Sequence, residues 1–432
     1  MATTGTEYEV SCEGEEQKPI IAAELDEENT PPNFGEAPDG GPRAWLVVTG
    51  SAFIFFSTVG YAYSFGVFQE YYMTHQVREE SPDNIAWIGS LSLFLQFAAG
   101  AIGGPLFDRF GAWVIRPAAV LYVFSIMMTS LCHEYWQFML TQGVLMGIAI
   151  GLLMFPAMAA VSQYFDKKRA TALGLALSGS SIGGVVIPIA LSKMLNSSSL
   201  GFGWTVRAIG LVMLPLLAFS CATVKSRLPP RKTTFFIGAA FKEANFILLI
   251  VSVFFIFLGI LTPLFFIPAY AVTRGMDAAL ASYLLTILNA AATFGRIIQG
   301  VLADKFGRLN ILALAGVITG IAICCLNKAE TTATLVLYSV VFGFSWGAIV
   351  SGSSAAFAVC PKDPRDIGTY IGIGLAVSSF GALIGPPVNG MLVNRYGGFF
   401  EAFVFSGVMC LVGGCTALAS KAATPQGILG KI

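Results

Sequence analysis

The sequence predicts an all-α integral membrane protein of twelve transmembrane helices, arranged as two similar six-helix halves. Of its 432 residues, 55% are hydrophobic and only 12% are charged, against about 25% in soluble domains. One pattern also occurs twice, 196 positions apart, as Gly104-Pro-Leu-Phe-Asp108-Arg109-Phe110-Gly111 and Gly300-Val-Leu-Ala-Asp304-Lys305-Phe306-Gly307. The composition excludes a soluble globular protein, and the repeat indicates two related halves.

Each half contains six apolar runs of about 20 residues, the length that a helix needs to cross about 30 Å of hydrocarbon. Between the sixth and seventh runs, a polar segment contains Pro229 and Pro230, which interrupt a helix. This organisation predicts an N-terminal half over 43–224, a linker over 225–243, a C-terminal half over 244–420 and a short tail over 421–432. The predicted spans are 44–66, 85–106, 112–131, 135–157, 170–192, 203–224, 245–268, 280–303, 309–327, 333–358, 367–392 and 399–420.

The first 42 residues hold eleven acidic residues and one lysine, and they lack the apolar core of a signal peptide. Their polar composition predicts a disordered acidic cytosolic tail over 1–42. In the remaining loops, seventeen basic residues fall on the side of the termini and six on the opposite side. Because cytoplasmic loops carry an excess of Lys and Arg, we expect both termini in the cytosol of a multi-pass cell-membrane protein.

Small residues recur along two of the predicted helices. Each forms a groove that lets a neighbouring helix approach closely, and the paired occurrence predicts an interface at which the two halves rock. In each copy of the repeated pattern, a carboxylate, a cation, an aromatic residue and a glycine end a helix and begin a tight turn. The small residues are Ala172, Ala176, Ser180, Gly184 and Pro188 in span five, and Gly374, Ser378, Ala382 and Pro386 in span eleven.

This layout resembles the major facilitator superfamily, which carries a repeated loop motif between spans two and three and between spans eight and nine. The resemblance implies the major facilitator fold, with a conformational latch formed by the carboxylate and its cation on the cytoplasmic side. The first copy has Ala112 where the second has Arg308, so its latch is expected to be weaker. The latch residues implied are Gly104, Asp108, Arg109, Gly300, Asp304, Lys305 and Arg308.

A narrower resemblance is to monocarboxylate transporters, especially their fungal members. Its motifs are Asp39-Gly-Gly-Pro-Arg-Ala-Trp45 before span one, and Tyr164-Phe-Asp-Lys-Lys-Arg-Ala-Thr-Ala-Leu-Gly174 with Ser178-Gly-Ser-Ser-Ile-Gly183 in span five. The resemblance implies an arginine in span eight that binds the substrate carboxylate. The sequence departs from animal members at Ala292, where they keep an acidic residue, and at Tyr63, which replaces the lysine of span one.

Arg296 is the one formal charge well inside an apolar run. It precedes Asp304 by eight residues, which places it about 12 Å from the cytoplasmic end of its helix. A guanidinium at that depth must face a polar cavity or a partner, or it bonds helix carbonyls. The resemblance favours Arg296 as an anion anchor. Tyr63 and Asn289 are the next candidates for substrate binding, the first by its matched position and the second because it lies two helical turns from Arg296 on the same face.

Other uncharged polar residues lie inside the predicted spans. Each can bond a ligand, but each can equally bond a neighbouring helix for about 0.6 kcal/mol, which is the simpler explanation for any one of them. The full set is Tyr61, Tyr63, Gln96, Gln142, Asn289, Trp346 and Asn389.

The leading functional hypothesis is a secondary transporter that moves a small organic monocarboxylate or an anionic secondary metabolite across the plasma membrane by alternating access. The alternatives are efflux of a neutral natural product and a transporter-like nutrient sensor that signals through its tail. An enzyme is not expected, because His75 and His133 lie in or beside outer loops and no buried pair of acids is available. The absence of a Gly-rich Lys-Ser/Thr loop excludes an ATP-driven pump.

The sequence contains no metal-ligand spacing, and no cofactor is expected. The expected partners are a small organic anion or metabolite and the lipid bilayer, without nucleic acid. Apart from Arg296, the interiors of the twelve predicted spans hold no Asp, Glu, Lys or His, since Glu401 is only the third residue of span twelve. Since an arginine does not release its proton at physiological pH, we expect facilitated diffusion, or at most a proton carried on the substrate itself.

Overall fold

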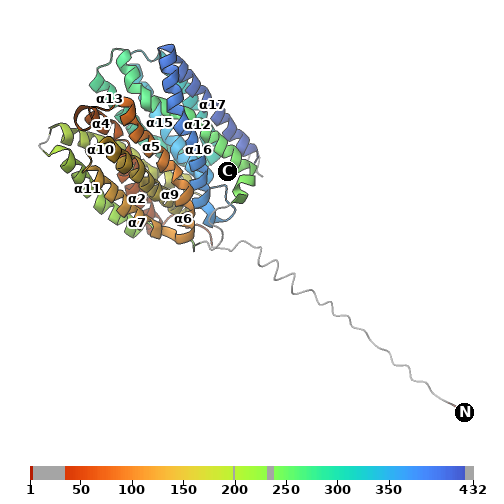
Figure 1. The fold of residues 1–432 in the computed structure, drawn as a ribbon. Coiled ribbons are helices and arrows are strands. Elements are labelled where there is room, and N and C mark those ends of the chain that lie inside the picture. The colour runs from red at the N-terminus through yellow and green to blue at the C-terminus, as the bar shows by residue number, and fades with distance from the viewer. Residues whose placement is uncertain (3–34, 198–199, 231–237, 424–432) are drawn as a thin grey trace. The chain divides into compact units, whose positions relative to one another are not determined.

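Helices make up the whole regular structure of the described residues, without a strand (Figure 1). The computed structural model describes residues 1–2, 35–197, 200–230 and 238–423. Eleven helical stretches within them are long and apolar enough to cross a membrane, and one, Asn84–Thr129, has 46 residues. A straight helix of that length would extend roughly 69 Å, about twice the hydrocarbon thickness. This stretch turns at Gly111 and makes two passes, so the twelve-span fold is confirmed.

The first half contains the six N-terminal spans. Two of them include short π-helices, a form that often marks functional positions inside membrane and soluble helices. In chain order the elements are α2 (Pro42–Ser57), α3 (Val59–Ala62), α4 (Phe65–Tyr71), η1 (Tyr72–Gln76), α5 (Pro82–Ala98), α6 (Gly100–Phe110), η2 (Gly111–Val114), α7 (Ile115–Thr129), α8 (Tyr135–Phe138), η3 (Met139–Leu145), α9 (Met146–Tyr164), α10 (Arg169–Ser197) and α11 (Gly201–Thr223).

The second half repeats this arrangement with longer uninterrupted helices. Its elements are η4 (Gly238–Lys242), α12 (Ala244–Thr273), α13 (Ala278–Phe306), α14 (Arg308–Cys325), η5 (Leu326–Lys328), α15 (Thr332–Phe357), η6 (Pro364–Asp366), α16 (Ile367–Tyr396) and α17 (Phe400–Ala422). Most helices begin or end several residues outside the predicted apolar runs, because a helix continues through polar residues once it has left the hydrocarbon.

The two predicted tight turns have the backbone that glycine favours. Gly111 has a φ of 66° and Gly307 a φ of 97°, a region that residues with a Cβ rarely adopt. Each glycine follows the aspartate, cation and aromatic residue of its copy. The repeated pattern therefore ends a helix in both halves, as expected from the sequence.

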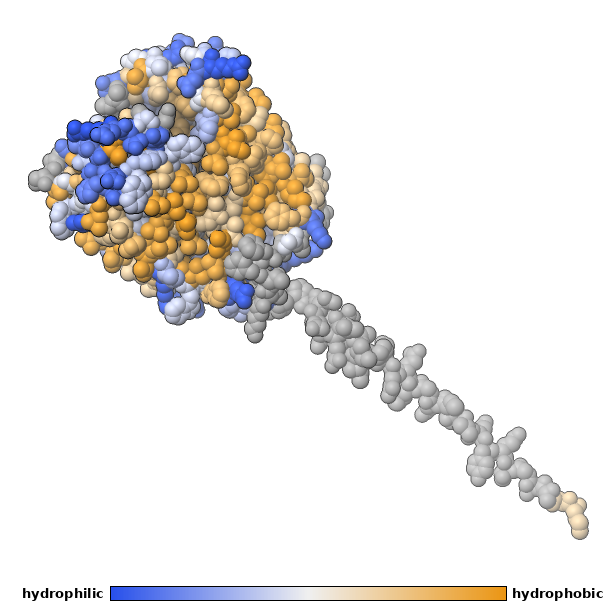
Figure 2. Space-filling model, in the orientation of Figure 1, coloured by the Kyte–Doolittle hydropathy of each residue, from blue (hydrophilic) through white to orange (hydrophobic). Residues whose placement is uncertain are grey.

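The two most extensive contacts between the two halves are each made by one pair of helices. In one pair α10 of the first half packs against α13 of the second, and in the other α6 packs against α16. The outer face of the bundle carries apolar residues over its middle, with hydrophilic residues gathered at both ends (Figure 2). Apolar side chains such as Val120, Leu211 and Leu337 are exposed on helices α7, α11 and α15, which fits a surface solvated by lipid.

The chain ends differ in part from the sequence-based expectation. Lys421 was assigned to the C-terminal tail, but it lies inside α17, where it is 2% exposed and its Nζ donates to Asn310 Oδ1 at 2.8 Å. This assignment is corrected because α17 continues past its apolar run. Residues 3–34 of the acidic tail, 231–237 of the linker and 424–432 lie outside the described residues.

Reporters at residue 10, within the linker 225–243 and at residue 430 should all face the cytosol, because basic residues are concentrated in the loops of that side. Labelling by a membrane-impermeant reagent in intact cells checks this, with a reporter in the opposite loop at 329–331 as the accessible control. Labelling of any of the first three sites in intact cells would contradict the orientation.

Candidate functional site

A cavity of about 430 Å³ lies between the two halves. Its walls come from α3, α4, α5, α9 and α10 of the first half and from α12, α13, α15 and α16 of the second. The volume falls within the range of about 300–1,000 Å³ that small-molecule sites usually have. A cavity bounded by both halves is the place where movement of one half against the other changes access.

Arg296 on α13 borders this cavity and is completely buried. Its Nη1 donates to the Leu177 carbonyl at 2.6 Å and to the Ser180 hydroxyl, and its Nη2 lies 3.4 Å from the Tyr63 hydroxyl. Its Nε has no partner among the described residues. The arginine thus bonds a helix carbonyl, which was one expectation from the sequence, and also borders a cavity, which was the other.

Tyr63 and Asn289, the other two residues expected to bind substrate, also line the cavity. Asn289 donates from Nδ2 to the Leu285 carbonyl at 3.1 Å, and this bond fixes the orientation of its amide. Its Oδ1 has no partner among the described atoms. Gly184 of α10 lies against both side chains, since a Cβ built there would come within 2.7 Å of Tyr63 and 3.2 Å of Asn289. The structure brings the three predicted residues to one wall.

The remaining polar candidates divide into two groups. Tyr61, Gln96, Gln142 and Trp346 line the cavity, and the Nε1 of Trp346 is buried without a partner among the described residues. Asn389 does not line it, because it bonds the Gly385 carbonyl and the Ser406 hydroxyl within the second half. The polar side chain of Asn389 is therefore explained by hydrogen bonds within the protein.

A methionine wall on α9, formed by Met146, Met154 and Met158, was missed by the sequence analysis. These residues are spaced by multiples of four, so they share one helix face. That spacing was visible in the sequence, but an apolar membrane helix offers many such rows, and only the fold shows which row faces a cavity. Methionine is unbranched and polarisable, so this wall adapts to apolar ligands of different shape.

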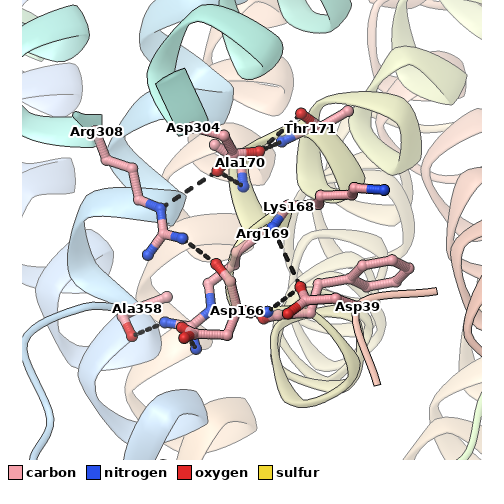
Figure 3. Close-up of polar contacts among 10 residues, drawn as sticks. Asp39, Asp166, Lys168, Arg169, Ala170, Thr171, Asp304, Arg308 and Ala358 are labelled. Carbon is pink, nitrogen blue, oxygen red and sulfur yellow. Dashed lines mark hydrogen bonds and ion pairs between the residues drawn. The ribbon is translucent and has the colours of Figure 1, made fainter. Parts of the chain in front are cut away.

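At one end of the bundle, Asp304 of α13 caps the first turn of α10 across the two halves (Figure 3). Its carboxylate accepts from the Ala170 amide at 3.0 Å, from the Thr171 amide at 2.8 Å and from the Thr171 hydroxyl at 2.7 Å. Arg308 lies 3.5 Å from Asp304 through its Nε and also donates to the Asp166 carbonyl. A carboxylate at a helix N-terminus satisfies amides that have no partner within the helix.

Asp108 of α6 makes the corresponding cap on α16. It accepts from the Gly368 amide at 3.1 Å, from the Thr369 amide at 2.6 Å and from the Thr369 hydroxyl at 2.6 Å. Thr171 and Thr369 are 198 positions apart, the offset of the two small-residue grooves. We call the end of the bundle that carries Asp108 and Asp304 the aspartate end.

The other latch residues have separate positions. Arg109 and Lys305, the cations directly after the aspartates, are exposed, and the ion pair described for Asp304 is made by Arg308. Gly104 and Gly300 lie where helices of opposite halves touch, since a Cβ on Gly104 would lie 2.0 Å from the Gly368 carbonyl oxygen. The glycines therefore permit the contact that the aspartates complete.

The segment before the first span joins this network (Figure 3). Asp39, with a φ of 48°, accepts from the amides of Asp166 at 2.7 Å and Lys168 at 3.2 Å. Arg169, the first residue of α10, donates to the Ala358 carbonyl of the second half at 2.8 Å. The two sequence motifs that resemble monocarboxylate transporters thus contact each other at the aspartate end.

No group of three or more His, Cys, Asp or Glu side chains gathers as a metal site within the described ranges. At the aspartate end, Asp108 and Asp304 cap helices of the opposite half, and Arg308 pairs with Asp304. The side chains that line the cavity offer hydrogen bonds, the charge of one guanidinium and apolar contact.

Comparison with known proteins gives a consistent family. The profile of the Major Facilitator Superfamily matches residues 45–363 and 300–427. The aspyridones efflux protein of Emericella nidulans is 47% identical over 394 residues, which cover 90% of this chain and 81% of that protein. The agnestins efflux protein of Paecilomyces divaricatus is 37% identical over 398 residues and covers 90% of each chain.

Solved structures agree with the fold. A proton:xylose symporter of the same superfamily has a TM-score of 0.70 at 16% identity, over 86% of this chain and 94% of its own. The human organic anion transporter MFSD10 has a TM-score of 0.68 at 15% identity, over 88% of this chain and all of its own, 100%. At such low identity these likenesses concern the fold alone.

Asp304→Asn should slow exchange between conformations more than Asp108→Asn, because an amide would present its own donors to the helix amides and Arg308 would also lose its carboxylate. Initial transport rates of the two variants, at equal surface abundance, measure the difference, and cargo preference should stay unchanged in both. Equal losses, or an altered preference in either variant, would contradict a latch at these positions.

Proposed function

Because the chain belongs to the major facilitator superfamily, we propose that it exports a small organic secondary metabolite across the cell membrane by alternating access of its central cavity. The chain is a multi-pass membrane transporter and not an enzyme. Export, the chemistry of the cargo and the membrane are the parts that we propose.

The relatives support efflux over carboxylate uptake. Two of them carry the name of an efflux protein, and both cover nine tenths of this chain. The sequence favours an organic anion, with efflux of a neutral natural product as one alternative, and the comparisons support that alternative better than carboxylate transport. Neither of these two relatives is named as a monocarboxylate carrier, so membership of that branch stays a prediction.

The cavity favours an amphiphilic cargo. Its methionine wall offers apolar contact, while Arg296, Trp346 and Asn289 contribute polar atoms that are buried without a partner among the described residues. Leaving such an atom unsatisfied costs about 1–3 kcal/mol. A head group with acceptor oxygens for the two N–H donors, and an O–H or N–H for Asn289, would satisfy all three. A simple carboxylate has no donor for Asn289.

The observation that carries the proposal is the buried guanidinium of Arg296 beside a cavity that both halves share. Its present acceptors, Leu177 and Ser180, belong to the first half, whereas Arg296 belongs to the second. An acceptor on the cargo can take the place of one of them only when the two halves move. Binding and rocking would then be linked at one side chain.

Deleting the gene in its own host should retain one metabolite in the cells and deplete it from the medium. Metabolite profiles of cells and medium, compared with the parent strain and with a strain in which the gene is restored, measure this and identify the cargo. A profile that does not change in either compartment, under conditions in which the gene is expressed, would contradict export.

Arg296→Gln should lower export at least about tenfold, since a hydrogen bond to a charged group contributes about 1.5–3 kcal/mol. Arg296→Lys should fail as well, because an ammonium lacks the planar fork of a guanidinium. Arg207→Gln is the matched control, because Arg207 bonds Ser130 and lies outside the cavity. Near-normal export by Arg296→Gln at normal surface abundance would remove Arg296 from the site.

A pH gradient alone should not drive accumulation of a cargo that stays ionised over the range tested. Among the described residues that line the cavity, none is Asp, Glu, Lys or His, and arginine keeps its proton. Uptake into proteoliposomes with an imposed gradient, with and without a protonophore, measures this. Accumulation that the protonophore abolishes would show that the protein carries the proton.

A further inference from the structure

The contact between α10 and α13 is continuous from the aspartate end to the middle of the membrane. A Cβ built on Gly300 would lie 2.6 Å from the Ala170 carbonyl oxygen, and one on Gly174 would lie 2.3 Å from that of Arg296. The two backbones therefore touch directly, one helical turn after another. The cap of Asp304 on Thr171 closes the same contact at its end. We call this contact the α10/α13 seam.

The side chain of Arg296 makes hydrogen bonds across this seam. The described hydrogen bonds of its guanidinium go to Leu177, Ser180 and Tyr63, all of which belong to the first half. The side chain is 0% exposed, so water does not compete for these bonds. In so dry a setting, hydrogen bonds to a charged group are stronger than at a surface.

The α6/α16 seam is built in the same way but has no arginine at the matching position. Asp108 caps α16 as Asp304 caps α10, and Gly104 meets Gly368 as Gly300 meets Ala170. At the offset of 196 that relates the two repeats, the position of Arg296 is occupied by Gly100, whose Cβ would lie 2.9 Å from the Gly372 carbonyl oxygen.

The position of Ser180, an acceptor of Arg296, also differs between the two seams. Ser180 corresponds to Ser378 at the offset of 198. Ser378 donates to Ile250 at 3.2 Å and to Gly374 at 2.8 Å, and both lie in its own half. One seam thus has a charged crossing at the level of Arg296, whereas Gly100, at the corresponding level of the other seam, has no side chain that could make one.

We propose that the two seams differ in how readily they open. Arg296, positioned by Ser180, holds the α10/α13 seam closed, while the α6/α16 seam opens more readily. The halves then separate asymmetrically at the aspartate end. This inference goes beyond the proposed function, because it concerns the empty protein and requires no cargo.

Hydrogen–deuterium exchange tests each seam separately. The amides of Ala170 and Thr171 are capped by Asp304, and those of Gly368 and Thr369 by Asp108, so their exchange reports the opening of one seam each. In the full chain in nanodiscs without cargo, the second pair should exchange faster than the first. Equal exchange of the two pairs would contradict the inference.

Arg296→Gln should raise exchange of the Ala170 and Thr171 amides at least about tenfold, the factor that corresponds to about 1.4 kcal/mol, and should change the Gly368 and Thr369 amides much less. No rise at the first pair, or an equal rise at both pairs, would overturn the proposal. The second of these results would indicate a general loss of stability instead of the specific loss of the Arg296 hydrogen bonds across the α10/α13 seam.

Ser180→Ala should produce the same pattern with a smaller rise, because it removes one acceptor of Arg296 and keeps the guanidinium. Ser378→Ala is the matched control, with the same change at the corresponding position of the other half, and should leave the α10/α13 amides unchanged. If Arg296→Gln fails to fold, the comparison of Ser180→Ala with Ser378→Ala tests the inference instead. Equal effects of the two serine variants on the Ala170 and Thr171 amides would contradict the proposed role of Arg296 and Ser180.

Discussion

The hydrocarbon interior of a membrane offers no hydrogen-bond partner, so a buried polar group is stabilised only by a partner inside the protein or on a bound ligand. Arg296 is the clearest case, since it is wholly buried and the acceptors described for its guanidinium lie across the boundary between the halves. Because of this requirement, a charged side chain lies at the boundary between the two halves. The cavity, the close helix contact and the asymmetry of the two seams all lie around it.

The same rule explains the aspartate end. A helix leaves its first amides without partners, and here α10 and α16 receive them from a carboxylate of the opposite half. A cap that comes from another domain stabilises the helix only while the two domains touch. Asp108 and Asp304 therefore make the integrity of a helix end depend on the relative position of the halves, which suits a transporter that must alternate between two arrangements.

The cavity combines two kinds of wall. Methionines of α9 form an adaptable apolar surface, while Trp346, Asn289 and Arg296 have buried polar atoms without a partner among the described residues. Under the proposed function, the apolar part would tolerate variation in the body of a cargo, and the polar part would require a matching head group, because an unmatched buried polar atom lowers affinity. Such a division is consistent with relatives that are named for the efflux of different natural products.

The sequence by itself determined the twelve spans, the two halves, the glycine turns and a guanidinium that had to meet polar atoms, because each follows from local hydropathy, repeats or the desolvation of one charge. Only the tertiary structure decided the partners of that charge, since Leu177 and Tyr63 are 119 and 233 positions away in the chain. The methionine wall, the burial of Lys421 and the contact of Asp39 with the loop before α10 were decided in the same way. Periodicity fixes which residues share a helix face, but the packing of distant helices fixes what that face meets.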